Sequence, residues 1–152
     1  MNQRDQVAMT AAEVAAFLAE SRKLQLATIN PDGTPHLVTM FYAMTGDEIA
    51  FWTYRASQKA RNLARDPRVS CLVEAGEDYF ELRGVQVNGT VRTVADYDGV
   101  FGIGRRIAGV LPGAPAGALD EYVAKQARKR TGFIVQPSRV ASWDHRKLLS
   151  RN

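Results

Sequence analysis

The chain has 152 residues, which is enough for one domain with a hydrophobic core and too few for two ordinary domains. Apolar residues make up 45% of the sequence and charged residues 24%, which argues against a disordered or fibrous protein. The net charge of +4 suits an anionic ligand, but the basic residues are dispersed and form no single tract, so nucleic-acid binding is weakly supported and we expect none. We therefore expect one globular domain over residues 1–152.

The sequence carries no signal for a membrane, a secretion route or a metal. No stretch approaches the roughly 20 apolar residues of a membrane span, and the first five residues lead into no apolar secretory run. We expect a cytoplasmic protein. With two histidines and one cysteine the sequence predicts no metal site. Cys71 lies in the apolar run 69–73 with neither histidine adjacent, so we interpret it as a buried, inert thiol and not as a nucleophile.

The first predicted elements are a helix and three strands. Thr10 and Glu13 have the spacing of a capping box, and apolar residues then recur at helical intervals, which predicts a helix over residues 10–20. Residues 24–28 alternate as a strand, a turn follows at 30–33, and a second extended run over 34–43 completes a β-hairpin. A turn at 45–47 then leads into a third antiparallel strand, 48–54.

A short helix and two strands follow. Ser57 begins the helix, and Asp66-Pro67 ends it because a residue before proline avoids the helical region. Strands are predicted over 68–74 and 80–94, with bends or bulges at Gly84 and Gly89. The alternative is that Asn88-Gly89 forms a tight hairpin turn and divides the second of these strands.

The C-terminal third begins as helix and ends as strand. Residues 96–130 have a helical pattern that the Pro- and Gly-rich segment 111–117 interrupts, so two helices flank a loop. A last strand over 131–143 contains Pro137, which indicates an edge or a bulge, and a basic tail, 144–152, follows. Because strands predominate and mostly follow one another, the predicted fold class is mainly β: a closed or partly closed antiparallel barrel with peripheral helices.

One segment has the chemistry of an anion site. In residues 51–63 a strand ends in hydroxyl and cationic residues at the start of a helix, where free N–H groups and the helix dipole favour phosphate. Ser57 supplies a hydroxyl group there, and Arg55, Lys59 and Arg61 supply positive charge. The alternative is an exposed cationic helix with a serine cap.

The same segment resembles a known family. Trp52-Thr53-Tyr54, Ser57-Gln58-Lys59, Asn62-Leu63 and Arg65-Asp66-Pro67-Arg68-Val69 together resemble the signature of the pyridoxamine 5'-phosphate oxidase-like split-barrel proteins. More narrowly, they are similar to the flavin/deazaflavin oxidoreductase branch of actinobacteria. The match includes residues 30–35, 83–85 and Gly89, and covers roughly residues 10–95. Its specificity lies in the spacing of the whole set.

The resemblance implies a split β-barrel homodimer with two cofactor sites at the subunit interface. The cofactor phosphate would bind at Ser57 and Lys59, and the ring would lie against the second and third strands. The partner subunit would contribute an aromatic and a basic residue, for which Trp143 and Arg146 are the candidates; the alternative for Trp143 is a core or interface aromatic. The other cofactor-binding residues that the resemblance implies are Val38, Thr39 and Met40 along the ring and Thr53, Arg55 and Gln58 near the phosphate.

Departures from the family narrow the expected chemistry. True pyridoxamine phosphate oxidases carry an arginine and a lysine around the apolar core of the second strand, where this chain has residues 36–40, and its C-terminus lacks their Arg-x-His element. Vitamin B6 oxidation is therefore not expected. Deazaflavin-binding members favour the Ser-x-Lys helix and a basic groove for an oligoglutamate tail. We expect an oxidoreductase that uses coenzyme F420 to reduce a small unsaturated or conjugated molecule. The alternative is an oxidoreductase that binds FMN in the same cleft. A third hypothesis is a non-catalytic protein that binds flavin, deazaflavin or haem.

No catalytic side chain is expected, because a reduced flavin or deazaflavin itself carries the hydride. His36 could protonate a substrate, but its place in a strand favours a packing or surface role. Residues 102–108 superficially suggest a dinucleotide-binding fingerprint, which we discount because the parallel βα unit that it requires is missing. We interpret the segment 96–117 as a lid or dimer contact.

Overall fold

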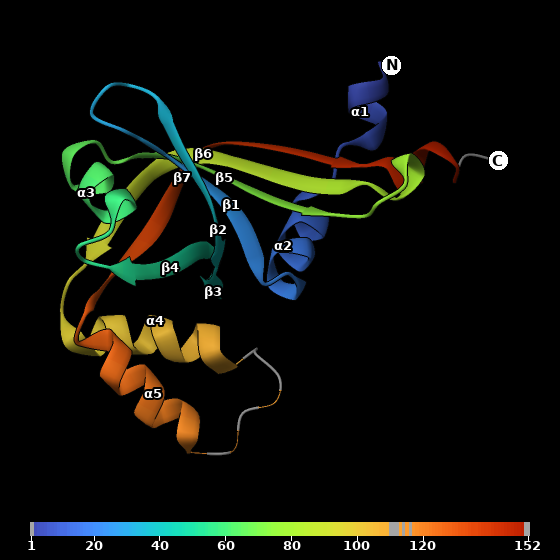
Figure 1. Ribbon diagram of the computed structural model, residues 1–152. Coiled ribbons are helices and arrows are strands. Elements are labelled where there is room, and N and C mark those ends of the chain that lie inside the picture. Colours follow the sequence, from blue (N-terminus) through green and yellow to red (C-terminus); the bar gives the residue numbers. More distant parts are fainter. Residues whose placement is uncertain (1, 110–112, 114, 116, 151–152) are drawn as a thin grey trace.

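A curled antiparallel sheet of seven strands forms the centre of the protein. The computed structural model describes residues 2–109, 113, 115 and 117–150 (Figure 1). The strands lie in the order β2-β1-β5-β6-β7-β4-β3, and their bounds are β1 Lys23–Ile29, β2 Pro35–Phe41, β3 Ala43–Thr45, β4 Glu48–Tyr54, β5 Arg68–Ala75, β6 Arg83–Val94 and β7 Arg130–Asp144. The sheet curls into a half-barrel, and the predicted mainly β fold with peripheral helices is confirmed.

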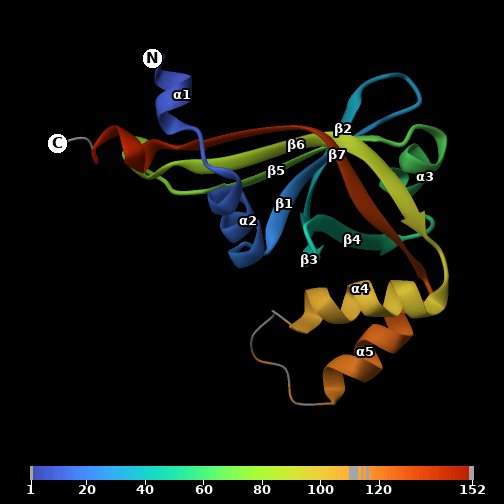
Figure 2. The same ribbon diagram turned by 180° about the vertical axis from the view of Figure 1, so that it is seen from behind.

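Helices cover the ends and one side of this sheet. They are α1 Gln3–Val7, α2 Ala11–Glu20, α3 Gln58–Arg65, α4 Tyr97–Gly109 and α5 Ala118–Ala127, with two short 3-10 helices, η1 Tyr79–Glu81 and η2 His145–Leu148. Figures 1 and 2 show α4 and α5 side by side beneath β4, while α3 and α1 lie at opposite ends of the molecule. Within the described ranges, no helix is long and apolar enough to cross a membrane.

Most predicted elements are confirmed because local chemistry fixes their ends. The capping box of α2 is present: the Glu13 N–H donates to Thr10 Oγ1 at 3.1 Å, and the Thr10 N–H donates to Glu13 Oε1 at 3.1 Å. Ser57 caps α3, which ends at Asp66 as its following proline requires. The two helices predicted within 96–130 are α4 and α5. Part of the loop predicted at 111–117 lies outside the described residues.

The extended run predicted over 34–43 is wrong in its length. It divides at Tyr42, whose side chain turns into the core and donates from its hydroxyl to the Leu18 carbonyl at 2.6 Å. The chain then starts a separate strand, β3, which pairs with β4. β4 is antiparallel as predicted, but its second neighbour is the distant strand β7.

The strand predicted over 80–94 starts later than expected, at Arg83, because residues 79–81 form η1. The hairpin alternative at Asn88-Gly89 is wrong: β6 runs through both residues, and a register shift between them marks the predicted bulge. Pro137 lies opposite Gly89, beyond the end of the β4–β7 pairing, so it occupies both an edge and a bulge.

Gly84 is not at a bulge, because the β5–β6 and β6–β7 registers continue through it. A glycine is required at position 84 because of the neighbouring side chain. The Trp143 indole lies against its Cα, where a Cβ would overlap the ring. The helix α1, which the sequence analysis did not predict, is a single short turn that Asn2 caps.

Two apolar clusters hold the molecule together. One fills the curl of the sheet, with Leu26, Phe51 and Val85 fully buried at its centre. The other joins β4 and β7 to α4 and α5 and includes Trp52 and Val123. β4 is therefore buried on both faces. It ends at Tyr54, and α3 begins four residues later, at Gln58.

Candidate functional site

The predicted cap at the start of α3 is formed as expected. The Ser57 hydroxyl accepts from the Ala60 N–H at 3.2 Å, and its oxygen lies 3.2 Å from the Thr53 hydroxyl. The Ser57 N–H donates to the Tyr54 carbonyl at 3.0 Å, which closes a tight turn between β4 and α3. The structure therefore brings Thr53 and Ser57 together at the N-terminus of the helix, where the dipole favours an anion.

Two cations lie beside this cap without a carboxylate partner. Lys59 is half-buried, and this burial, followed by the nearby positive charge of Arg130, lowers the pKa of Lys59. The Arg130 guanidinium lies 4.1 Å from the centre of the Tyr54 ring and 4.8 Å from that of Trp52. No ion pair within the described part of the chain includes Lys59 or Arg130. The site therefore holds positive charge that its own side chains do not neutralise.

Arg130 was missed by the sequence analysis. It is the first residue of the last strand, some seventy residues after Lys59, and only the pairing of β4 with β7 places it opposite Tyr54. A cation facing an aromatic residue across two strands gives no short-range signal in the sequence. Prediction of this strand pairing would have been needed to find it.

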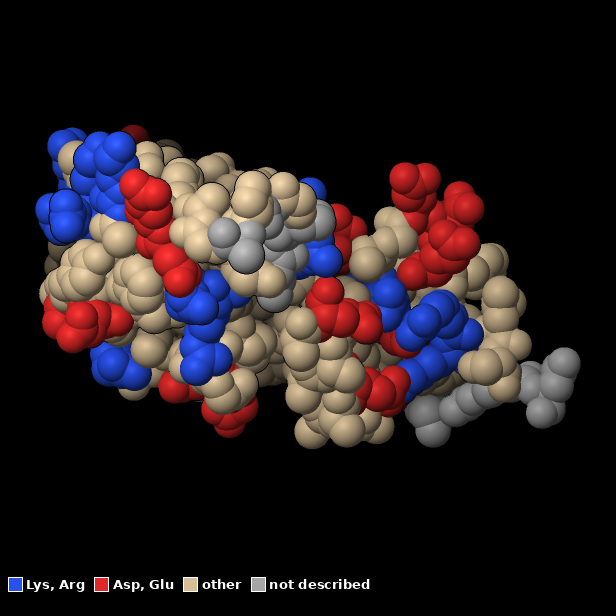
Figure 3. All heavy atoms as spheres, turned by 90° about the horizontal axis from the view of Figure 1, so that it is seen from below, with Lys and Arg blue, Asp and Glu red and all other residues tan. Residues whose placement is uncertain are grey.

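Arg55 forms hydrogen bonds to the backbone of the α5–β7 junction. Its guanidinium donates to the Arg128 carbonyl at 2.6 Å, and its N–H donates to the Lys129 carbonyl at 3.1 Å. These bonds tie the β4–α3 turn to the α5–β7 junction, which carries exposed Arg128 and Lys129. We define the basic corner as Arg55, Lys59, Arg128, Lys129 and Arg130. Figure 3 shows basic side chains gathered at the end of the molecule that carries α3, to the left.

Gln58 forms a hydrogen bond within α3. Its amide donates to Asn62 Oδ1 at 2.8 Å. Asn62 is fully buried and donates to Thr28 Oγ1 and Asn30 Oδ1, both at 3.0 Å. This network fixes α3 to the β1–β2 hairpin, so the predicted phosphate residues and the predicted ring-binding strand are held rigidly relative to each other.

The three predicted ring-lining residues of β2 alternate between two faces. Val38 and Met40 face inward and pack against the core, whereas Thr39 faces outward and donates to Gln25 Oε1 at 2.8 Å. A ring lying on either face of β2 would therefore meet only some of these side chains. The outward face of the strand also carries Leu37 and Phe41, which are 69% and 46% exposed.

Trp143 lies far from the basic corner of its own chain. It is at the end of β7, on the arm that β5, β6 and β7 extend beyond the barrel (Figures 1 and 2). There it lines a hollow of about 900 Å³ between α1 and the outer face of the sheet, together with Arg139 and His145. Within one chain the structure does not bring Trp143 to Ser57 and Lys59.

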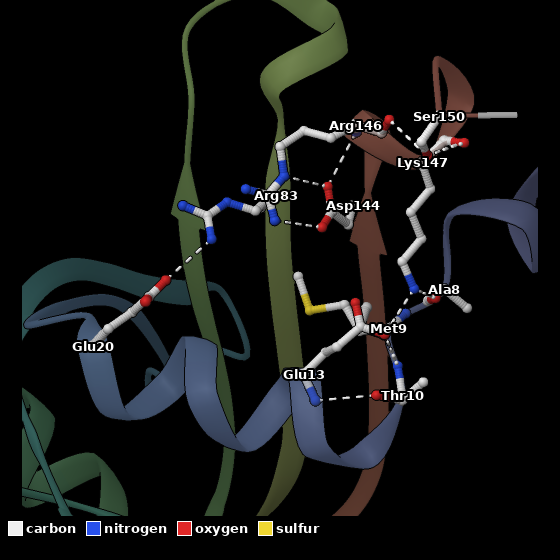
Figure 4. A network of polar contacts seen from close by, with 11 residues as sticks. Ala8, Met9, Thr10, Glu13, Glu20, Arg83, Asp144, Arg146, Lys147 and Ser150 are labelled. Atoms are coloured by element: carbon white, nitrogen blue, oxygen red, sulfur yellow. Dashed lines mark hydrogen bonds and ion pairs between the residues drawn. The ribbon is translucent and has the colours of Figure 1, made fainter. Parts of the chain in front are cut away.

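Arg146, the predicted partner cation, has its charge neutralised by a neighbour. It donates from Nε and Nη2 to the two oxygens of Asp144, at 2.9 and 2.7 Å (Figure 4). These bonds hold the pKa of the buried Asp144 carboxyl below its usual range. Two other arginines, Arg4 and Arg139, line the hollow and belong to no ion pair among the described residues.

Neither Cys71 nor a cluster of metal-ligating side chains forms a second candidate site among the described residues. Burial raises the pKa of the Cys71 thiol to about 12, so the thiol stays protonated at neutral pH, as predicted for an inert cysteine. In the ranges that the structure describes, no group of three or more histidine, cysteine or acidic side chains is placed to hold a metal ion.

Comparisons with known proteins agree with this architecture. The model of the family described as pyridoxamine 5'-phosphate oxidase matches residues 10–144. A curated relative, the pyridoxine/pyridoxamine 5'-phosphate oxidase of Rhodopseudomonas palustris, is 29% identical and is matched over 87% of this chain and 75% of its own length.

Two solved structures are similar along nearly their whole length. A conserved hypothetical protein from Mycobacterium tuberculosis is 40% identical, with a TM-score of 0.90, over 100% of this chain and 95% of that one. A protein described as an F420 reductase is 28% identical, with a TM-score of 0.62, over 83% of this chain and 94% of that one.

Proposed function

We propose an oxidoreductase function for this chain, which belongs to the pyridoxamine 5'-phosphate oxidase family. It would bind coenzyme F420 at the interface of a homodimer and transfer a hydride to a small unsaturated or conjugated substrate. The observation that carries this proposal is the pair of cations, Lys59 and Arg130, beside the capped N-terminus of α3. Like charges held close together without a carboxylate repel each other, and a bound phosphate removes that repulsion.

The residues at the corner fit a phosphate-bearing cofactor. Lys59 and Arg130 would contact the phosphate oxygens, with the Ser57 hydroxyl and the first N–H groups of α3 beside them. Tyr54 and Trp52 fix Arg130 by stacking, so little side-chain freedom is lost when the anion binds. Exposed Arg128 and Lys129 extend the positive surface toward an oligoglutamate tail.

The bound deazaflavin supplies the hydride, so the protein needs to orient the two reactants and exclude water from them. The inward face of β2, where Val38 and Met40 are only partly buried, is the surface against which the ring would lie. FMN is the alternative cofactor, because its single phosphate also fits Ser57 and Lys59. Similarity along the chain to a protein described as an F420 reductase favours the deazaflavin.

A homodimer would bring the two halves of the site together. The outer face of the sheet presents Leu37 and Phe41 on β2, and Trp143 and Arg139 line the hollow between this face and α1. A second copy packed on this face would place its Trp143 and Arg139 near the basic corner of the first. In this proposal Arg139 replaces Arg146 as the cation that the partner contributes.

The test is a side-by-side titration of the purified apo-protein with F420 and FMN, followed by cofactor fluorescence. We expect F420 to bind in the micromolar range and more tightly than FMN. Preferential FMN binding would promote the alternative cofactor, and a failure of both to bind would favour the haem-binding or non-catalytic hypothesis.

A further inference from the structure

His36 carries an unexplained buried nitrogen. It lies on β2 opposite Thr28 of β1, on the same face of its strand as Val38 and Met40. Its Nδ1 is shielded from solvent and has no hydrogen-bond partner, and no other side-chain nitrogen or oxygen of the described residues has this status. Buried polar atoms are nearly always paired, so this exception needs a physical reason.

The surroundings of His36 indicate which of its two nitrogens carries the proton. A neutral imidazole has one N–H and one bare nitrogen. A proton on Nδ1 would create a buried donor without an acceptor, which proteins tolerate less well than a shielded lone pair. The proton therefore belongs on Nε2.

The Nε2 atom is free and reachable. No residue in the described ranges accepts a hydrogen bond from it, and it is not among the shielded atoms, so it remains open to a ligand. The cross-strand neighbour of His36 is Thr28 of β1, which accepts a hydrogen bond from Asn62 of α3. His36 therefore lies on the face of the β1–β2 pair that α3 contacts through Thr28.

We propose that His36 is a binding residue that donates a hydrogen bond from Nε2–H to an oxygen of the ligand seated against β2. The inference rests on the proposed function, because the ring of F420 or FMN carries carbonyl oxygens that accept such a bond. The shielded Nδ1 fixes the tautomer, so the donor is present before the ligand arrives. His36 acts here through recognition and not through proton transfer.

A packing role for His36 makes opposite predictions. If the imidazole only filled space, His36→Phe would keep the ring, remove the unpaired nitrogen and leave ligand binding unchanged. His36→Gln would then be the more harmful change, because it loses the flat ring. If His36 is a donor, His36→Gln is the conservative variant, because its side-chain amide can replace Nε2–H.

The first measurement is nitrogen NMR of the apo-protein labelled with ¹⁵N-histidine, at pH 8. The chain has only two histidines, so His145→Gln assigns both ring systems. We expect the Nε2–H tautomer at His36 and a change in its Nε2 signal on saturation with F420. A proton on Nδ1 in the apo-protein would overturn the proposal whatever the protein binds.

The second measurement is the dissociation constant of F420, or of FMN if FMN binds more tightly, for three proteins. We expect His36→Phe to bind about tenfold more weakly than the wild type and His36→Gln to stay within about threefold, as the loss and retention of one hydrogen bond imply. Thermal unfolding of each variant verifies that it is folded. Lys59→Ala separates the two proposals: if it weakens binding and His36→Phe does not, the role of His36 is wrong and the proposed function stands. If the wild type binds neither cofactor, both fail.

Discussion

The basic residues of this chain divide into those with a carboxylate partner and those without one. Arg68, Arg83 and Arg146 each contact an acidic side chain at 2.7–3.0 Å, which compensates their charge. Lys59 and Arg130 lie close enough for Arg130 to lower the pKa of Lys59, and neither has such a partner among the described residues. The closeness of these two cations, with no carboxylate paired to either, points to the start of α3 as the place for an anionic ligand.

Lys59→Ala tests this assignment directly. We expect it to weaken binding of the phosphate-bearing cofactor by about 1–3 kcal/mol, the usual value of a charge-assisted hydrogen bond. Fluorescence titration of wild type and variant at one salt concentration gives the difference.

Lys23→Ala is the matched control for Lys59→Ala. Lys23 is exposed at the start of β1, and the opposite end of this strand contacts α3. Its removal should leave the dissociation constant unchanged. Equal losses in the two variants would mean that the effect is one of net charge and that the anion does not bind at Ser57.

Cys71 makes the stability of the fold sensitive to alkaline pH. Burial raises its pKa to about 12, whereas an unfolded thiol ionises near 8.5. Between these values the unfolded chain binds fewer protons than the folded one, so the free energy of unfolding falls as pH rises. We expect a loss of about 2 kcal/mol between pH 8.5 and 10.5 from this thiol.

Urea unfolding of wild type and Cys71→Val at both pH values isolates the contribution of the thiol. The variant should lose less stability over the same interval. Tyr42, whose pKa burial also raises, contributes a further loss above pH 10 in both proteins. Identical pH dependence in the two proteins would show that the thiol is not the titrating group.

At the scale of elements, the sequence predicts what neighbouring residues determine. The Thr10–Glu13 box, the Ser57 cap and the proline at 67 each act within four residues, and the helices they delimit are where they were expected. The division of the second extended run at Tyr42 could not be predicted, because it depends on a hydrogen bond to Leu18, in a helix formed by distant sequence. For the same reason the candidate site could be predicted only in part: Ser57 and Lys59 lie in one motif, whereas the place of Arg130 beside them depends on the pairing of β4 with β7.

Two glycines of α4 provide a matched test of how this helix packs on the sheet. Gly104 lies against the Trp52 ring, where a Cβ would overlap the indole, whereas a Cβ at Gly102 would meet nothing within 4 Å. We expect Gly104→Ala to destabilise the protein by about 1–3 kcal/mol. Gly102→Ala should stabilise it by up to about 1 kcal/mol, because alanine favours the helix.

Chemical unfolding of these two single variants measures both effects. A lid that rests loosely on the barrel would tolerate both substitutions equally. That result would contradict the close packing of α4 on β4, which also orders Trp52 beneath Arg130.

At the scale of the whole molecule, the components of the proposed site lie at opposite ends of one chain. The basic corner is beside α3, and the hollow that Trp143 and Arg139 line lies between α1 and the sheet. Figure 2 shows α3 and α1 at opposite ends of the molecule. A single rigid sheet cannot bring them together. Two copies packed antiparallel on the outer face of the sheet can, because each arm would then reach the corner of the other chain.

Leu37→Arg tests this arrangement. Leu37 is 69% exposed on the outward face of β2, and an arginine there would place a charge in the proposed apolar contact between copies. We expect the variant to be folded but monomeric at micromolar concentration by light scattering, and to bind the cofactor at least about tenfold more weakly. Tyr122→Arg, at a 54% exposed position on α5 away from this face, should keep both properties of the wild type. A monomeric Leu37→Arg protein with full cofactor affinity would show that one chain holds the complete site, and Trp143 and Arg139 would then need another role.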